Sequence, residues 1–121
     1  MRPVLEHVST NVQNFVENYH STILQEIIKH VESDKIVVVG MAQNPVVKKA
    51  RKMLTAKNLE YTYLEYGSYF SMWKERLAIK MWSGWPTFPQ VFIHGSLVGG
   101  ADDLAKLFSE GKIQALLEQK Q

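Results

Sequence analysis

A short run of β-branched residues that stops at a glycine constrains the fold of this chain most strongly. Ile36 to Val39 is continuously apolar and Gly40 ends the run, which is typical of a strand covered on both faces in an α/β sheet. Asn44 then stands as a helix N-cap, with Pro45 at the first helical position, where a missing N–H is tolerated. Tyr61 to Tyr66 follows as a second strand. A strand, a crossover helix and a strand predict a right-handed parallel unit.

The other elements are predicted from apolar spacing and turn residues. Apolar residues recur at three- or four-residue steps from Val12 to Val31, which indicates one long helix or two with a break near residue 21, where Thr22 and Gln25 fit a capping box. The crossover helix is predicted to end near Asn58. The next element is a helix from Ser68 to Ser83, with Tyr69, Trp73, Leu77 and Met81 at four-residue spacing. Two strands over 91–93 and 96–98 follow, joined by a turn at His94-Gly95. The chain then continues with a helix capped by Asp102 or Asp103 and a last helix after Gly111.

The crossover helix has two contrasting faces. Its inward stripe is predicted to consist of Val46, Val47, Ala50, Met53 and Leu54. Its outer face is basic, which fits either a solvated surface or recognition of a partner. The residues of that outer face are Lys48, Lys49, Arg51, Lys52 and Lys57.

Composition narrows the function classes. A chain of 121 residues is long enough for one compact domain, and a net charge of only +2 argues against a protein that binds nucleic acid by neutralising many phosphates. No apolar run approaches the roughly 20 residues needed to span a bilayer, and the polar start lacks the apolar core of a secretion signal, so no membrane partner and a cytoplasmic location are predicted. The chain has no cysteine, which excludes disulfides, thiolate catalysis and cysteine-ligated metal from its own side chains. Its histidines are scattered without ligand spacing, so no metal site is predicted either.

Two loops have residue types suited to a small zwitterionic peptide. Thr87 and Phe88 precede Pro89, so their backbone is left extended and able to pair with an extended peptide. Gly99 and Gly100 allow close approach to the backbone, although ordinary turn chemistry explains these glycines equally well. The free N–H groups at the start of the helix after Gly100 attract a carboxylate. The side chains of Asp102 and Asp103 either accept hydrogen bonds from an amine or simply cap the helix.

The segment Trp85-Pro86-Thr87-Phe88-Pro89-Gln90-Val91-Phe92-Ile93, followed by Gly95 and by Leu97-Val98-Gly99-Gly100-Ala101-Asp102-Asp103-Leu104, closely resembles the second half of a glutaredoxin. The similarity covers roughly residues 34–118. It implies a thioredoxin-like three-layer α/β fold, in which a four-stranded mixed sheet is flanked by helices. Residues 1–33 would form an N-terminal helical extension and residues 34–121 the glutaredoxin-like domain.

The resemblance also implies a ligand, glutathione, and the residues that would bind it. Thr87 to Pro89, with a cis proline at 89, would hold the cysteinyl backbone, while Gly100, Ala101 and Asp102 would meet the γ-glutamyl end. Arg76 matches the position of a group that binds the glycyl carboxylate, although a solvated helix arginine is the plainer interpretation.

The chain departs from the family where the family's chemistry occurs. Glutaredoxins have Cys-Pro-x-Cys or Cys-Gly-Phe-Ser at the start of the crossover helix, whereas this chain has Asn44-Pro45-Val46-Val47. Asn44 takes the nucleophile's place and Val47 that of the second cysteine, so thiol–disulfide exchange has no thiolate and an iron–sulfur cluster has no protein ligand. Met41 replaces a lysine usual in dithiol members. A lost charge-assisted hydrogen bond of about 1.5–3 kcal/mol would lower glutathione affinity by roughly one to two orders of magnitude unless Arg76 or Lys80 compensates.

Three functional hypotheses follow. The leading hypothesis is a non-redox glutaredoxin-like protein that retains a groove for glutathione or a related thiol peptide. The second is a protein–protein interaction module that acts through the N-terminal helix or the basic helix face, with a vestigial groove. The third is an enzyme that uses the thiol of bound glutathione, which ranks last because no general base stands beside Asn44.

Overall fold

The sheet of the computed structural model, which describes residues 2–118, has the strand order β2-β1-β3-β4. β1 pairs parallel with β2 and antiparallel with β3, and β3 pairs antiparallel with β4. The strands are β1 (Ile36–Gly40), β2 (Thr62–Glu65), β3 (Gln90–Ile93) and β4 (Ser96–Gly99). The predicted mixed four-stranded sheet is therefore confirmed, and β1 is buried along its whole length, as its continuous apolar run predicts.

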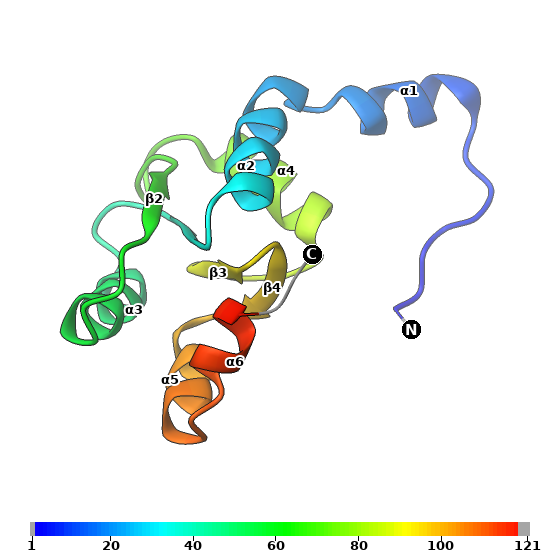
Figure 1. Cartoon of the computed structure of the whole chain (residues 1–121). Coiled ribbons are helices and arrows are strands. Elements are labelled where there is room, and N and C mark those ends of the chain that lie inside the picture. The colour runs from blue at the N-terminus through cyan, green and yellow to red at the C-terminus, as the bar shows by residue number, and fades with distance from the viewer. Residues whose placement is uncertain (1, 119–121) are drawn as a thin grey trace.

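Helices cover both faces of the sheet and make three layers (Figure 1). Val37 and Val39 of β1 lie in one core cluster with α2 and α4, whereas Ile36 and Val38 lie in the other with α3, α5 and α6. This alternation follows from the two-residue period of a strand. The helices are α2 (Ser21–Ser33), α3 (Pro45–Ala56), α4 (Trp73–Ser83), α5 (Ala101–Ser109) and α6 (Ile113–Glu118).

The N-terminal helical segment divides into two parts. α1 (Thr10–Asn18) stands away from the body of the protein and buries none of its residues, whereas Ile27 and Val31 of α2 are buried in the core (Figure 1). The break near residue 21 is confirmed, but the capping box of Thr22 and Gln25 was wrong. The helix begins at Ser21 after a left-handed residue 20 that makes no side-chain cap. The division at residue 33 stays a prediction, although α2 packs as part of the core.

The start and the buried face of α4 differ from the prediction. The helix begins at Trp73 rather than near Ser68, because the hydroxyls of Ser68 and Ser71 hold a turn: Phe70 N–H donates to Ser68 Oγ at 3.2 Å and Ser68 N–H to Ser71 Oγ at 3.1 Å. The side chains with four-residue spacing are exposed, and the buried ones lie on another face. The exposed residues are Tyr69, Trp73, Leu77 and Met81, and the buried residues are Arg76, Ala78 and Ile79.

Smaller differences concern element ends. α3 ends at Ala56, two positions before Asn58, and β2 is one residue shorter at each end than the predicted 61–66. Val46, which was placed in the inward stripe of α3, is exposed, while Val47, Ala50 and Leu54 are buried as predicted.

Asp34 ties the end of α2 to the edge strand β2. Thr62 Oγ1 donates to Asp34 Oδ2 at 2.7 Å, His30 Nδ1 lies 2.9 Å from the same oxygen, and Ser33 Oγ donates to Oδ1 at 3.1 Å. The hydrogen bond from Thr62, supported by those from His30 and Ser33, holds the pKa of Asp34 below its ordinary value of 3.8.

Replacement of Asp34 by Asn should destabilise the protein in a pH-dependent way. A carboxyl whose pKa is lowered by folding contributes stability above its ordinary pKa and loses that contribution as the pH falls through the folded-state pKa. We therefore expect Asp34→Asn to lower the urea midpoint at pH 7 and to approach the wild type as the pH falls through the lowered pKa of Asp34. Glu32→Gln, at an exposed site on the same helix, is the control; a deficit in Asp34→Asn that stayed constant from pH 7 to pH 2 would contradict the charge argument.

Candidate functional site

Asn44 closes the N-terminus of α3. Its Oδ1 accepts from the backbone N–H of Val46 at 2.9 Å and of Val47 at 3.0 Å, and Pro45 occupies the first turn. The predicted N-cap is thus confirmed. Two of the first-turn N–H groups, which have no partner inside a helix, are satisfied by this amide.

Val47, which the sequence places at the family's second cysteine, packs in the core. The side chain is buried, and a Cβ added to Gly40 at the end of β1 would come within 2.7 Å of Val47 Cγ1. Met41 is buried in the same core cluster as Val47. The loop between β1 and α3 is held by a hydrogen bond from Ala42 N–H to Gly67 O at 2.7 Å. These positions thus have packing and capping roles in this chain.

Gln90 holds the segment that precedes β3 by a side-chain hydrogen bond. The Phe88–Pro89 peptide bond is cis, and Phe88 and Pro89 are buried while Thr87 is exposed. Gln90 is fully buried, and its Nε2 donates to Trp85 O at 3.0 Å, which spans the turn. Within residues 2–118, the buried Nε1 of Trp85 and Oε1 of Gln90 have no hydrogen-bond partner. The segment Trp85–Gln90 is therefore a loop closed by one buried hydrogen bond, and two of its own buried polar atoms have no hydrogen-bond partner among the described residues.

The start of α5 lies beside this loop. Gly100 rather than an aspartate is the N-cap, and Asp103 at the third helical position accepts from Gly100 N–H at 2.9 Å, so the predicted caps at Asp102 or Asp103 were wrong by a few positions. Gly99 has a φ of 116°, and a side chain there would collide with the Asp103 carboxyl group. Ala101 is buried, and Asp102 is exposed, with Lys49 Nζ 3.5 Å from its Oδ1.

The structure brings the two predicted segments together. Val91 pairs with Gly99 across β3 and β4, and a Cβ on Gly100 would lie 3.5 Å from Pro89 O and 3.8 Å from Trp85 Nε1. We call residues 87–90 and 99–103 together the loop surface. The glycine at position 100 leaves open the space next to a backbone carbonyl and an unpaired indole N–H.

Arg76 is engaged elsewhere. It is buried, and its Nη1 donates to Tyr66 O at 3.0 Å and to Ser71 O at 2.6 Å, so the guanidinium holds the loop between β2 and α4. Lys80, one helical turn further along α4, has its Nζ 5.6 Å from the centre of the Phe88 ring. The sequence indicated Lys80 only as a substitute for a lost lysine, although its spacing of four from Arg76 places it on the same helix face.

The described part of the chain holds no group of three acidic or histidine side chains arranged around a common point as a metal site requires. No helix within residues 2–118 has the length and apolar character to cross a bilayer. The cytoplasmic location stays a prediction.

Comparisons with known proteins agree on one family. The family model for glutaredoxin matches residues 36–98. A glutaredoxin-like protein of Dictyostelium discoideum is 47% identical over 119 residues, which is 98% of this chain and 97% of that protein. Glutaredoxin 1 of Rickettsia prowazekii is 38% identical over 85 residues, which is 70% of this chain and 88% of that protein.

Solved structures show the same fold. Oxidized glutaredoxin 2 of Chlamydomonas reinhardtii has a TM-score of 0.69 and 30% identity, covering 81% of this chain and 92% of its own. The buckwheat glutaredoxin–glutathione complex has a TM-score of 0.71 and 24% identity, covering 84% and 92%. The thioredoxin-like glutaredoxin fold predicted from the sequence is confirmed.

Removal of the Asn44 amide should weaken the start of α3. Asn44→Ala leaves two N–H groups without an acceptor, so we expect the free energy of unfolding to fall by about 0.5–2 kcal/mol in urea titrations. Asn44→Asp keeps an acceptor and adds a charge favoured at a helix N-terminus, so it should retain or raise stability. Equal stability of Asn44→Ala and wild type would show that this cap contributes nothing.

Proposed function

The chain belongs to the glutaredoxin family, and we propose that it binds glutathione or a related thiol peptide without exchanging thiols with it. The observation that carries this proposal is the contrast between a preserved loop surface and an asparagine at the nucleophile's position. Ligand recognition in this proposal depends on backbone groups and on the charged side chains of Asp102 and Lys80. The lost chemistry depends on a single atom type, a thiolate sulfur, which this chain does not contain.

Backbone groups of the loop surface support peptide binding. The backbone of Thr87 and Phe88 is free of secondary-structure pairing before β3 begins at Gln90, so it can pair with an extended cysteinyl unit. The first-turn N–H groups of α5 have no intrahelical partners and attract a carboxylate. Gly100 contributes no side chain over this region, and the exposed Asp102 carboxylate is available to an amine. A γ-glutamyl group, with one carboxylate and one amine, satisfies both.

The glycyl carboxylate needs a cation, and Lys80 is the better placed candidate. The Lys80 ammonium lies over the Phe88 ring, at the start of the loop surface. Arg76 already donates to the backbone carbonyls of Tyr66 and Ser71, and breaking those bonds would leave the buried carbonyl of Tyr66 unpaired. In this proposal Lys80 binds the glycyl carboxylate of the ligand. Arg76 keeps its hydrogen bonds to the loop between β2 and α4.

The non-redox half of the proposal follows from elementary chemistry. Thiol–disulfide exchange begins with a thiolate that attacks a disulfide sulfur and forms a mixed disulfide. An amide at position 44 cannot do this, and its oxygen is bonded to two N–H groups. Iron–sulfur clusters are held by thiolates, so the donor set of this site does not fit one.

A second candidate function rests on α1. The helix buries no residue, and Val12, Phe15 and Val16 are more than two-fifths exposed, which is unusual for the apolar stripe of an amphipathic helix. The Dictyostelium relative matches across almost the whole chain, so this segment has a counterpart there. Such a stripe favours a protein–protein interaction module whose loop surface no longer binds a ligand.

A titration with reduced glutathione separates the two functions. We expect saturable amide NMR shifts at residues 87–90 and 99–103 of the labelled protein. Lys80→Gln should weaken binding by roughly tenfold, the effect of losing one charge-assisted hydrogen bond. Lys74→Gln is the matched control, because Lys74 lies over the Trp73 ring on the same helix, 5.6 Å from its centre.

The outcomes are distinct. Loss of binding in Arg76→Ala but not in Lys80→Gln would mean that Arg76, and not Lys80, binds the glycyl carboxylate. No shifts at about ten millimolar glutathione, equivalent to binding weaker than about −3 kcal/mol, would contradict the proposal and favour the interaction module.

Introduction of a thiol at position 44 tests the non-redox half. Wild type should show no glutathione-dependent disulfide reductase activity, and any such activity in the pure protein would contradict the proposal. Asn44→Cys should react with glutathione disulfide, forming a protein–glutathione mixed disulfide and releasing one glutathione thiolate, because a helix N-terminus lowers a thiol pKa. Ser109→Cys, exposed at the end of α5, is the control, and mass spectrometry should show at least tenfold slower modification.

A further inference from the structure

The helix α3 carries an uncompensated positive charge. Its sequence, Pro45–Ala56, contains four cations and no acidic residue. Lys48, Arg51 and Lys52 follow one another at i, i+3 and i+4, so their side chains are neighbours on one helix face. Like charges at these spacings repel, and Lys48 also stands near the positive end of the helix dipole. The arrangement opposes helix stability unless something negative lies against it.

The described part of the chain supplies almost no counter-charge to this face. Lys49 is paired with Asp102, and the other two ion pairs within residues 2–118 are His30 with Asp34 and Lys112 with Glu110. Lys48, Arg51 and Lys52 thus have no ion-pair partner there. The carboxylate of Glu65 on β2 accepts from Tyr63 Oη at 2.9 Å and forms no ion pair with these three cations.

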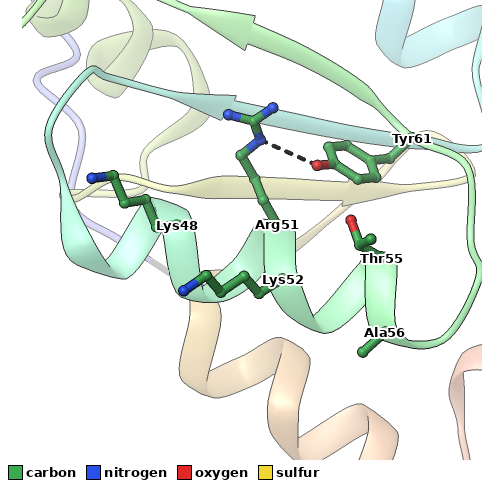
Figure 2. Close-up of a pocket in the computed structure, with 6 residues that line it drawn as sticks. All are labelled: Lys48, Arg51, Lys52, Thr55, Ala56 and Tyr61. Atoms are coloured by element: carbon green, nitrogen blue, oxygen red, sulfur yellow. Dashed lines mark hydrogen bonds between the residues drawn. The ribbon is translucent and has the colours of Figure 1, made fainter.

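The three cations line a shallow open cavity of about 460 Å³, shown in Figure 2. Arg51 rises from α3 toward the sheet, where its Nε donates to Tyr61 Oη at 3.1 Å (Figure 2). Its Cζ lies 3.8 Å from the centre of the Tyr63 ring, so the guanidinium is held in place by both tyrosines. The remaining wall consists of Thr55, Ala56 and the Tyr61 ring. The cavity therefore combines a guanidinium held by two tyrosines, two exposed ammonium groups and an apolar side.

We propose that this cavity binds a phosphate monoester. Such a group carries between one and two negative charges near pH 7 and three acceptor oxygens, so it can interact with more than one of the cations that line the cavity, which a carboxylate does less well. In the proposed complex the phosphate binds the Arg51 guanidinium, the long side chains of Lys48 and Lys52 turn toward it from neighbouring positions of the same helix face, and the organic part of the ligand packs against Tyr61 and Ala56. The cavity volume is in the range of small-molecule sites. The site shares no residue with the loop surface, so it stands or falls independently of glutathione binding.

The test is an amide NMR titration of the full chain with phenyl phosphate at low salt. We expect saturable amide shifts at residues between Lys48 and Tyr61. The affinity should fall as salt is added, because salt screens the attraction between the phosphate and the cations. Lys48→Gln and Lys52→Gln should each weaken binding about two- to fivefold, the range for exposed charge pairs, and the double variant about tenfold. Lys29→Gln, an exposed lysine on α2, should leave it unchanged. Arg51→Gln is not used alone, because Arg51 also packs on Tyr63.

Additional probes identify the source of the phosphate. Tighter binding of phenyl phosphate than of inorganic phosphate supports contact with the Tyr61 ring and a small phosphorylated molecule. A phosphoserine peptide that binds more tightly still, while its unphosphorylated form does not bind, supports a phosphorylated protein. Shifts that are equally strong in the double variant, or that sodium sulfate at equal ionic strength reproduces with the same affinity, overturn the proposal. An absence of shifts between 48 and 61 at ten millimolar phenyl phosphate also overturns it.

Discussion

Complete burial of β1 is the constraint on which the other elements depend. The strand lies between β2 and β3 and contributes alternate valines to the two core clusters, so helices must cover both faces of the sheet. Its last residue, Gly40, has no side chain, and this absence lets Val47 and the first turn of α3 pack against the strand end. The position of Asn44 is thereby fixed relative to the sheet.

Asn44 and Val47 have structural roles, as a helix cap and as part of the core. A cysteine thiolate at a helix N-terminus is stabilised by the same N–H groups that the Asn44 amide now accepts from. The asparagine therefore satisfies the helix terminus without a thiolate, and Val47 fills the space beside Gly40 with apolar atoms. Recognition elements built from backbone, such as the segment before β3 and the start of α5, do not depend on that sulfur. Loss of the thiol is physically compatible with retention of a binding surface.

The parts of the fold that the sequence predicted are those with local causes. The β-branched run at 36–39, the N-cap at Asn44 with Pro45, and the turn at His94-Gly95, where both residues have positive φ, are each determined by the residues involved. The buried face of α4 was not predictable in this way, because periodicity identifies a helix without identifying which stripe meets the sheet. Arg76 is buried where the carbonyls of Tyr66 and Ser71 in the preceding loop accept from it, and Asp34 at the end of α2 is held by Thr62 on β2. Such contacts come from tertiary packing, which has no signature in local spacing.

Charge distribution around α3 argues for two separate binding regions on one helix. Lys49 contacts Asp102 at the start of α5, whereas Lys48, Arg51 and Lys52 face the cavity near Tyr61. The Lys49–Asp102 pair is 3.5 Å long and both side chains are largely exposed, so it contributes at most about 1 kcal/mol and a ligand amine can displace it. The pair therefore does not block the loop surface, and its lysine is not available to the cavity. Because the Lys49–Asp102 pair and the cations that line the cavity do not overlap, a ligand at the loop surface and an anion in the proposed cavity would not compete for the same side chain.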